Sequence, residues 1–122
     1  MTQALASSLG HPLTPKDTLD VLRNVVGFSD KEIGRALRVT DRSVKRWRSG
    51  APVSPSSEEG LHDLARIVAT LAEYQLPAAN IRAWFLYRNR FLEDERPIDS
   101  FAKGGYMAAQ PALAAIRDSV YG

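Results

Sequence analysis

The chain has 122 residues, 44% of them hydrophobic and 25% charged, and this composition favours one globular domain, or a small domain with an appendage, over a disordered chain. The formal net charge is only +2, and the absence of cysteine excludes disulfides, thiolate nucleophiles and cysteine-based zinc sites. No apolar run approaches the roughly 20 residues that span a bilayer, and the N-terminus lacks the cationic start of a signal peptide, so we expect a cytoplasmic protein with no membrane partner.

The first expected element is a helix that follows a flexible lead-in over residues 1–13. Thr14 and Pro15 have the residue types of an N-cap and of a first helical position, and Asp17 places an acid in the first turn. Apolar residues then recur at helical spacing, and Gly27 is a natural stop for this helix.

Two short helices are expected next. Ser29 and Glu32 have the spacing of a capping box, which predicts the start of the second helix. Thr40 is expected to cap a third helix that runs from residue 41 to about Ser49 and is closed by Gly50. The pattern therefore predicts two short helices joined by a tight turn.

The turn between these helices has the features of a helix-turn-helix, which we assign to residues 14–50. Such a motif crosses two helices steeply, so it needs a small residue at their contact and apolar residues around the turn. Gly34 supplies the small residue, whereas Arg38 stands in the turn, where a left-handed backbone is costly for a residue with a side chain. The apolar set expected to face inward is Ile33, Leu37, Val39, Val44 and Trp47.

Positive charge is concentrated in residues 29–50, where seven cations and three acids give +4, so the rest of the chain carries −2. Such a concentration on one element is typical of a phosphate-binding surface. Arg42 and Arg46 lie one helical turn apart and suit guanine edges, whereas Lys45 and Arg48 suit phosphates. A merely solvated surface, or a helix used in protein assembly, is the alternative interpretation. The predicted DNA-binding residues are Thr40, Asp41, Arg42, Ser43, Lys45, Arg46 and Arg48.

A linker and a second helical region complete the chain. The linker is expected over residues 51–60, which contain two prolines, three serines and a glycine. An amphipathic helix over residues 61–76 follows, and Pro77 begins another. Residues 87–105 mix charges with proline and glycine and are expected to be irregular. In the terminal apolar helix, Pro111 marks either a kink or the true start. No stretch alternates as a strand does, so the predicted fold class is all-α.

Enzymatic chemistry finds little support in the sequence. Glu58 and His62 are four residues apart and could face each other on a helix, but one histidine and one carboxylate make an incomplete site. The acids of residues 93–95 are typical of a solvated turn, and no glycine loop that cradles phosphate is present. We therefore expect a protein that is not an enzyme and has no cofactor and no metal.

The order of motifs resembles a known family. Residues 14–50, with their ending SVKRWRSG, resemble an Xre-type helix-turn-helix. The helix of residues 61–76, followed by IRAWF, RNRFL and GGY, resembles the toxin-binding domain of MbcA/ParS/Xre antitoxins. The signature of that domain is an aromatic pair, an asparagine, an apolar residue, a proline, and a glycine before the last helix. The matching positions are Trp84, Phe85, Asn89, Leu92, Pro97 and Gly105.

The same positions have a physical interpretation. Asn89 is expected to cap the short turn that carries Leu92, and Pro97 is expected to open a helical turn that includes Ile98 and Phe101. The glycine pair at 104–105 would then break that turn, so that the last helix can fold back. Trp84 is expected to be a core residue.

The resemblance implies the antitoxin of a type II toxin-antitoxin system, which inhibits an NAD+-consuming RES-domain toxin and represses its own operon by binding DNA. Residues 61–122 would bind the toxin and self-associate, giving homo-oligomers and a complex with the toxin, and residues 106–122 would be interface and plug. The alternative is a stand-alone helix-turn-helix regulator whose C-terminal half only dimerises. The candidate toxin-binding residues are Phe85, Tyr87, Arg88, Asn89, Tyr106, Arg117 and Tyr121.

Overall fold

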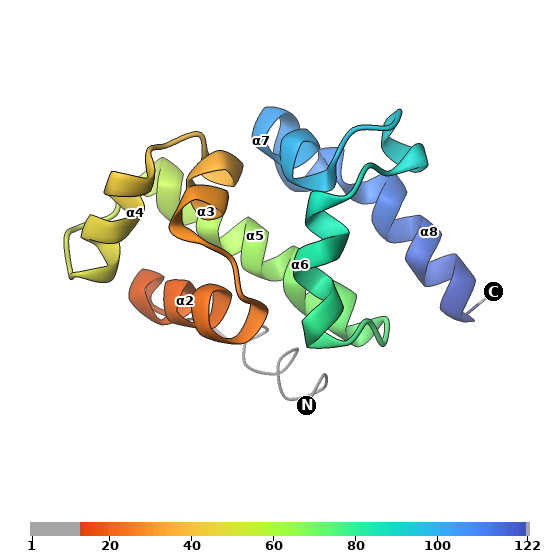
Figure 1. The fold of residues 1–122 in the computed structure, drawn as a ribbon, viewed down its shortest axis with the longest axis horizontal. Coiled ribbons are helices and arrows are strands. Elements are labelled where there is room, and N and C mark those ends of the chain that lie inside the picture. The colour runs from red at the N-terminus through yellow and green to blue at the C-terminus, as the bar shows by residue number, and fades with distance from the viewer. Residues whose placement is uncertain (1–12, 122) are drawn as a thin grey trace.

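The structure, a computed structural model, describes residues 13–121, so that nearly all of the expected lead-in lies outside the described residues (Figure 1). Within this range the chain forms helices and turns without a strand, and its single isolated bridge pairs Asn89 with Glu95, which confirms the all-α fold. The elements in chain order are α2 (Pro15–Val21), the π-helix η1 (Leu22–Val26), α3 (Asp30–Leu37), α4 (Asp41–Arg48), α5 (Pro55–Glu73), α6 (Ala78–Leu86), the 3-10 helix η2 (Arg90–Leu92), α7 (Pro97–Ala108) and α8 (Gln110–Tyr121).

The predicted start and stop signals of the first helices are confirmed. The Thr14 hydroxyl accepts a hydrogen bond from the Asp17 backbone N–H at 3.1 Å, and Gly27 ends η1 in a left-handed conformation with φ +93°. The capping box is reciprocal, because Ser29 Oγ accepts from the Glu32 N–H and Glu32 Oε1 accepts from the Ser29 N–H. The sequence did not predict the π-helical final stretch, η1, which continues α2 to Gly27.

The linker is shorter than predicted. Helix α5 begins at Pro55, so only residues 51–54 connect it to the preceding turn. The cause is local: Ser54 caps the helix by accepting from the Ser57 N–H at 3.3 Å, and a proline is well suited to the first helical position. The serines and prolines that indicated a linker are thus the N-terminal capping sequence of a helix.

The segment predicted to be irregular over residues 87–105 is partly helical, as its own capping signals indicate. Asn89 Oδ1 accepts from the Phe91 N–H at 2.9 Å and caps η2, and Pro97 occupies the first position of α7. Gly105, with φ +72°, breaks the helical path inside α7, as expected. Pro111 is the second residue of α8, so it marks the start of that helix.

Helix α5 is the central element of the core. It contacts α2 and α3 on one side and α6, α7 and α8 on the other, and Figure 1 shows it crossing between the two groups of helices. Its Leu61, Ile67, Val68 and Leu71 are at most 1% exposed. One continuous core includes residues from α2 through α8, so the two predicted regions pack as one unit. No helix in the described range is both long and apolar enough to cross a bilayer.

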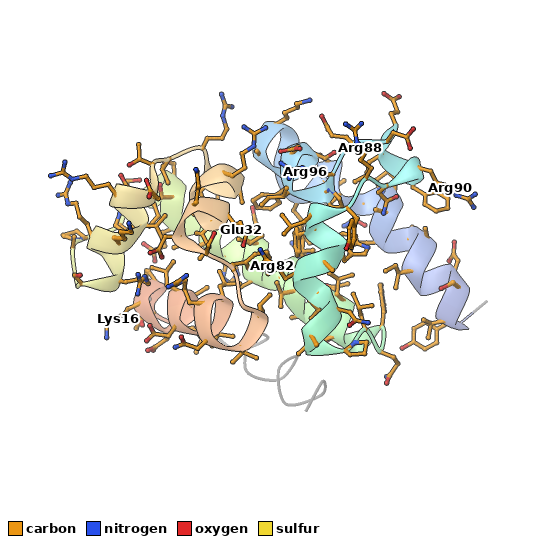
Figure 2. The ribbon with its side chains drawn as sticks, viewed as in Figure 1. Lys16, Glu32, Arg82, Arg88, Arg90 and Arg96 are labelled. Atoms are coloured by element: carbon orange, nitrogen blue, oxygen red, sulfur yellow. The ribbon has the colours of Figure 1, made fainter. Side chains whose placement is uncertain are left out.

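Ion pairs also connect the two groups of helices. The Arg82 guanidinium of α6 donates to both Glu32 carboxylate oxygens on α3, at 3.0 and 2.6 Å, and Figure 2 shows these side chains pointing toward each other. Asp99 of α7 accepts from Arg35 of α3 at 2.9 Å and from Arg96 at 2.8 Å. The carboxylates are only 17% exposed, so they lie at the seam between α3 and the C-terminal helices.

These contacts set the protonation of both acids. Partial burial by itself would raise the pKa of Glu32, but hydrogen bonds from Arg82 and from the Ser29 backbone lower it below its ordinary value of 4.5. Hydrogen bonding from Arg96, assisted by Arg35, lowers the pKa of Asp99 against the opposing effect of burial. Both acids are therefore charged at neutral pH and stabilise the folded state there.

Replacing Arg82 by Gln should lower the free energy of unfolding at pH 7 by at most about 1 kcal/mol, because the Arg82 side chain is 46% exposed and water screens the pair. Since the folded pKa of Glu32 is lowered, its contribution is complete above about pH 4.5 and is lost as the pH falls through the folded value. Urea denaturation at pH 7 and pH 3 should therefore show the difference between wild type and R82Q shrinking in acid. An equal difference at both pH values would contradict this origin, and R117Q is the matched surface control.

Candidate nucleic-acid and protein interfaces

The turn between α3 and α4 brings two backbones into contact. A Cβ atom added at Gly34 would lie 2.7 Å from the carbonyl oxygen of Val39, so only glycine fits without a shift. Arg38 ends α3 in a left-handed conformation, with φ +61° and ψ +41°, as its place in the turn predicts. The small residue at the crossing is thus confirmed, and Arg38 adopts the conformation that is costly for a side chain.

Helix α4 turns its apolar side to the core. Val44 is fully buried and Trp47 is 8% exposed, and both belong to the core cluster together with Ile33 of α3. Thr40 caps α4 by accepting from the Ser43 N–H at 3.1 Å. The rotation of α4 predicted from the sequence is therefore confirmed, and it determines which side chains point outward.

The outward side of α4 is cationic. Arg42 and Arg46 are exposed, and no acid within the described part of the chain lies in ion-pairing distance of either. Lys45 is also exposed and pairs loosely with Asp41 at 3.6 Å. The Thr40 hydroxyl is already engaged, because it donates to Ser43 Oγ at 3.1 Å. Thr40 therefore serves as the N-cap of α4. The exposed cations on this side, Arg42, Lys45 and Arg46, all belong to α4 itself.

Arg48 was predicted to be part of this exposed face, and that prediction is wrong. Its guanidinium donates to both oxygens of Asp30, at 2.9 and 2.7 Å, and the Asp30 side chain is only 8% exposed. The Arg23 Nε atom lies 3.3 Å from the same carboxylate. Arg48 stands one turn after buried Val44, so it points along the contact between α4 and the start of α3. It joins the end of α4 to the start of α3, and any phosphate contact would have to compete with this ion pair.

The predicted protein-binding residues divide between surface and core. Tyr87 is 72% exposed at the end of α6, and Arg88 beside it is exposed. Phe85 is fully buried and meets the ring of Phe28 edge-on, with 5.3 Å between centroids, so its assignment to an interface is wrong. Tyr87 follows the end of α6 with an extended backbone, and its side chain lies at the surface while that of Phe85 lies in the core. Trp84, expected in the core, is partly buried against it.

The other four candidates have specific local contacts. Asn89 caps η2, and the Tyr106 ring lies beneath the Arg66 guanidinium, 4.1 Å from the ring centroid. Arg117 is exposed and pairs with its neighbour Asp118. Tyr121 is 64% exposed, but its hydroxyl donates to the Glu73 carbonyl at 3.2 Å, which ties the end of α8 to the end of α5.

The terminal segment is less exposed than predicted. Ala112 and Leu113 of α8, and Ala109 just before it, are at most 2% exposed, so the apolar side at the start of α8 is covered and is not a free surface. Sequence reasoning also missed two exposed apolar side chains, Phe91 at 48% and Met107 at 74%. Phe91 directly precedes buried Leu92 in η2. Two adjacent apolar residues in a short turn cannot both face the core, and this was the available sequence signal for an exposed Phe91. Met107 follows the break at Gly105, whose geometry the sequence does not give.

The alternative of a metal or acid–base site gains no support in the described residues. Glu58 and His62 are both exposed on α5, and no group of three or more possible metal-ligating side chains occurs within residues 13–121. The acids of residues 93–95 lie in the turn after η2, where Glu95 is paired with Lys103.

Comparisons with known proteins place the chain among antitoxins. No protein-family model matches it. It is 26% identical to the probable mycobacterial cidal antitoxin Rv3188 of Mycobacterium tuberculosis, over 96% of this chain and 99% of that protein. It is 30% identical to the mycobacterial cidal antitoxin MbcA of Mycobacterium bovis and of M. tuberculosis, over 79% of this chain and 85% of theirs.

A solved structure gives the same indication. A chain in the crystal structure of the M. tuberculosis MbcT–MbcA toxin-antitoxin complex superposes with a TM-score of 0.72 and 27% identity, covering 91% of this chain and all of that one. Fold and sequence together define an all-helical antitoxin. The chain belongs to the family of the mycobacterial cidal antitoxin MbcA.

Replacing Arg48 by Met should lower the free energy of unfolding by about 2–4 kcal/mol, since it leaves a buried carboxylate with fewer partners. Adding Asp30→Asn to this variant should recover part of the loss, because the unpaired charge disappears. Lys45→Gln, which breaks an exposed pair, should cost no more than roughly 0.5 kcal/mol. Denaturant unfolding of the four proteins measures this, and equal losses for R48M and K45Q would show that the Asp30 contact is unimportant.

Proposed function

We propose that this protein is an antitoxin that binds and inhibits a protein toxin encoded beside it, and that it also represses its own operon by binding DNA. The observation that carries the first part is the likeness, over most of the chain, to antitoxins, one of them crystallised with its toxin. The motif resemblance supports a RES-domain toxin that consumes NAD+. The protein itself acts by binding, without catalysis.

The toxin-binding surface is proposed to lie on the segment from the end of α6 to the end of α7. Tyr87, Phe91 and Met107 are large apolar side chains that this segment leaves exposed, and Arg88 adds a cation. Aromatic residues, methionine and arginine are the residue types enriched in protein interfaces. Tyr87 and Arg88 stay from the sequence-based set, whereas Phe91 and Met107 join it because of their exposure.

Coexpression of the chain with the neighbouring toxin gene should rescue growth, and the double variant Y87S/M107S should lose at least tenfold in toxin affinity, as loss of exposed anchors at an interface predicts. Val25→Ser is the matched control, because Val25 is an apolar residue 49% exposed on η1, outside this segment of the chain. Pull-down and growth rescue are the measurements. Truncation of residues 106–122 is a poorer test, since it removes buried Leu113 from the core.

Undiminished toxin binding by Y87S/M107S would refute this surface while leaving the antitoxin function standing. A chain that rescues no toxin and forms a stable homodimer would favour the alternative, a stand-alone regulator whose C-terminal half dimerises it.

The proposed DNA-binding element is α4. Its packing through Val44 and Trp47 leaves Arg42 and Arg46 exposed, one turn apart and unopposed by acids of the described chain. Such a helix can enter the major groove with its first turns at the base edges. Arg42 and Arg46 are proposed to form bidentate hydrogen bonds with guanine. Lys45 and Ser43 are proposed to contact the DNA sugar–phosphate backbone. Asp41 stands beside these residues at the start of α4.

Binding to duplexes from the upstream region should weaken steeply with salt, and replacing Arg42 or Arg46 by Gln should cost about 1–3 kcal/mol and relax preference at one base pair. Fluorescence anisotropy across salt concentrations measures both effects. Arg117→Gln, at an exposed cation on α8, is the control and should bind as wild type does. A salt slope near zero for the wild type would remove DNA binding from the proposal.

A further inference from the structure

A cationic hollow lies where the helix-turn-helix meets the C-terminal helices. It has a volume of about 570 Å³ and is lined by Gly34, Arg35, Arg38, Val39, Asp99, Ala102 and Lys103. Three of these side chains are cations and one is an acid. The hollow therefore combines residues of α3, of the turn and of α7, which are far apart in the sequence.

The cations of the hollow remain accessible. The side chains of Arg35 and Lys103 are 61% and 72% exposed, and no acid in the described part of the chain pairs with exposed Arg38. Arg35 uses its Nε atom on Asp99, a carboxylate that Arg96 also holds. Lys103 pairs with Glu95. Ion pairs this exposed are weak in water, so a phosphate can compete for the cations.

The position of the hollow relates it to the proposed recognition helix. Arg38 and Val39 immediately precede Thr40, the N-cap of α4. A recognition helix enters the major groove by its N-terminal end, while the preceding helix crosses the sugar–phosphate backbone. A cationic hollow beside that end thus lies where a strand flanking the groove would pass.

We propose that this hollow binds a backbone phosphate of the operator, with Arg38 and Lys103 as its principal contacts. The inference rests on the proposed DNA binding by α4 and extends it: Lys103 belongs to α7, so the DNA footprint includes the region proposed for toxin binding. The contact is to phosphate and carries no base preference.

Replacing Arg38 or Lys103 by Gln should each reduce the slope of log affinity against log salt by about 0.9, which corresponds to about an eightfold loss at 0.1 M salt if the curves converge at 1 M. The loss should be the same for operator and unrelated duplexes. Position 38 has a left-handed backbone, with φ +61°, which costs glutamine about as much as arginine. R38Q therefore changes the charge and little else.

The control for Lys103 is Glu95→Gln. It breaks the same ion pair but removes a negative charge, so it should leave DNA affinity unchanged or raise it. Equal losses in E95Q and K103Q would show that the ion pair, and not a phosphate contact, matters, and would overturn the proposal. Thermal unfolding of each variant checks that the fold is retained.

The outcomes separate the two proposals. A wild-type protein with no salt-dependent binding refutes DNA binding by α4 itself. A wild type that binds, with R42Q and R46Q weakened but R38Q and K103Q keeping the full slope, refutes the hollow alone.

Discussion

The arrangement of α3 and α4 depends on the buried carboxylate of Asp30. A buried charge must be paired. Both carboxylate oxygens of Asp30 accept hydrogen bonds from Arg48 at the end of α4, and Arg23 Nε of η1 lies 3.3 Å from one of them. Three elements are thus fixed around one acid at the start of α3. Val44 and Trp47 bury the adjacent side of α4. Because these contacts determine the rotation of α4, they also determine that Arg42 and Arg46 face solvent.

The same helix α3 is held on its other side by the C-terminal region. Glu32 and Asp99 connect it to α6 and α7, and α5 fills the core between them. Coupling between sites needs two arrangements whose populations both ligands shift. One shared core and these ion pairs argue for a rigid body instead. If toxin and DNA influence each other, direct overlap near α7 is then the simplest route, since α7 carries both Lys103 and Met107.

Local signals in the sequence were sufficient for most of the fold. Thr14, Ser29 and Asn89 act through backbone groups at most three residues away, so their roles can be read from spacing alone. The errors at Arg48 and Phe85 have a different origin. Whether Arg48 meets solvent or Asp30 depends on how two helices cross, and Phe85 is buried because Phe28 packs against it. Such contacts form only in three dimensions.

The turn after η2 carries backbone strain that packing alone does not explain. Glu93 and Asp94 are consecutive residues with φ of +56° and +64°, a conformation that costs each of them of order 1 kcal/mol. Their turn allows the Asn89 and Glu95 backbones to pair, which holds Leu92 inward and leaves Phe91 half exposed. A core requires only Leu92. The strained turn therefore closes a short loop in which one apolar side chain, Leu92, joins the core and its neighbour Phe91 stays at the surface.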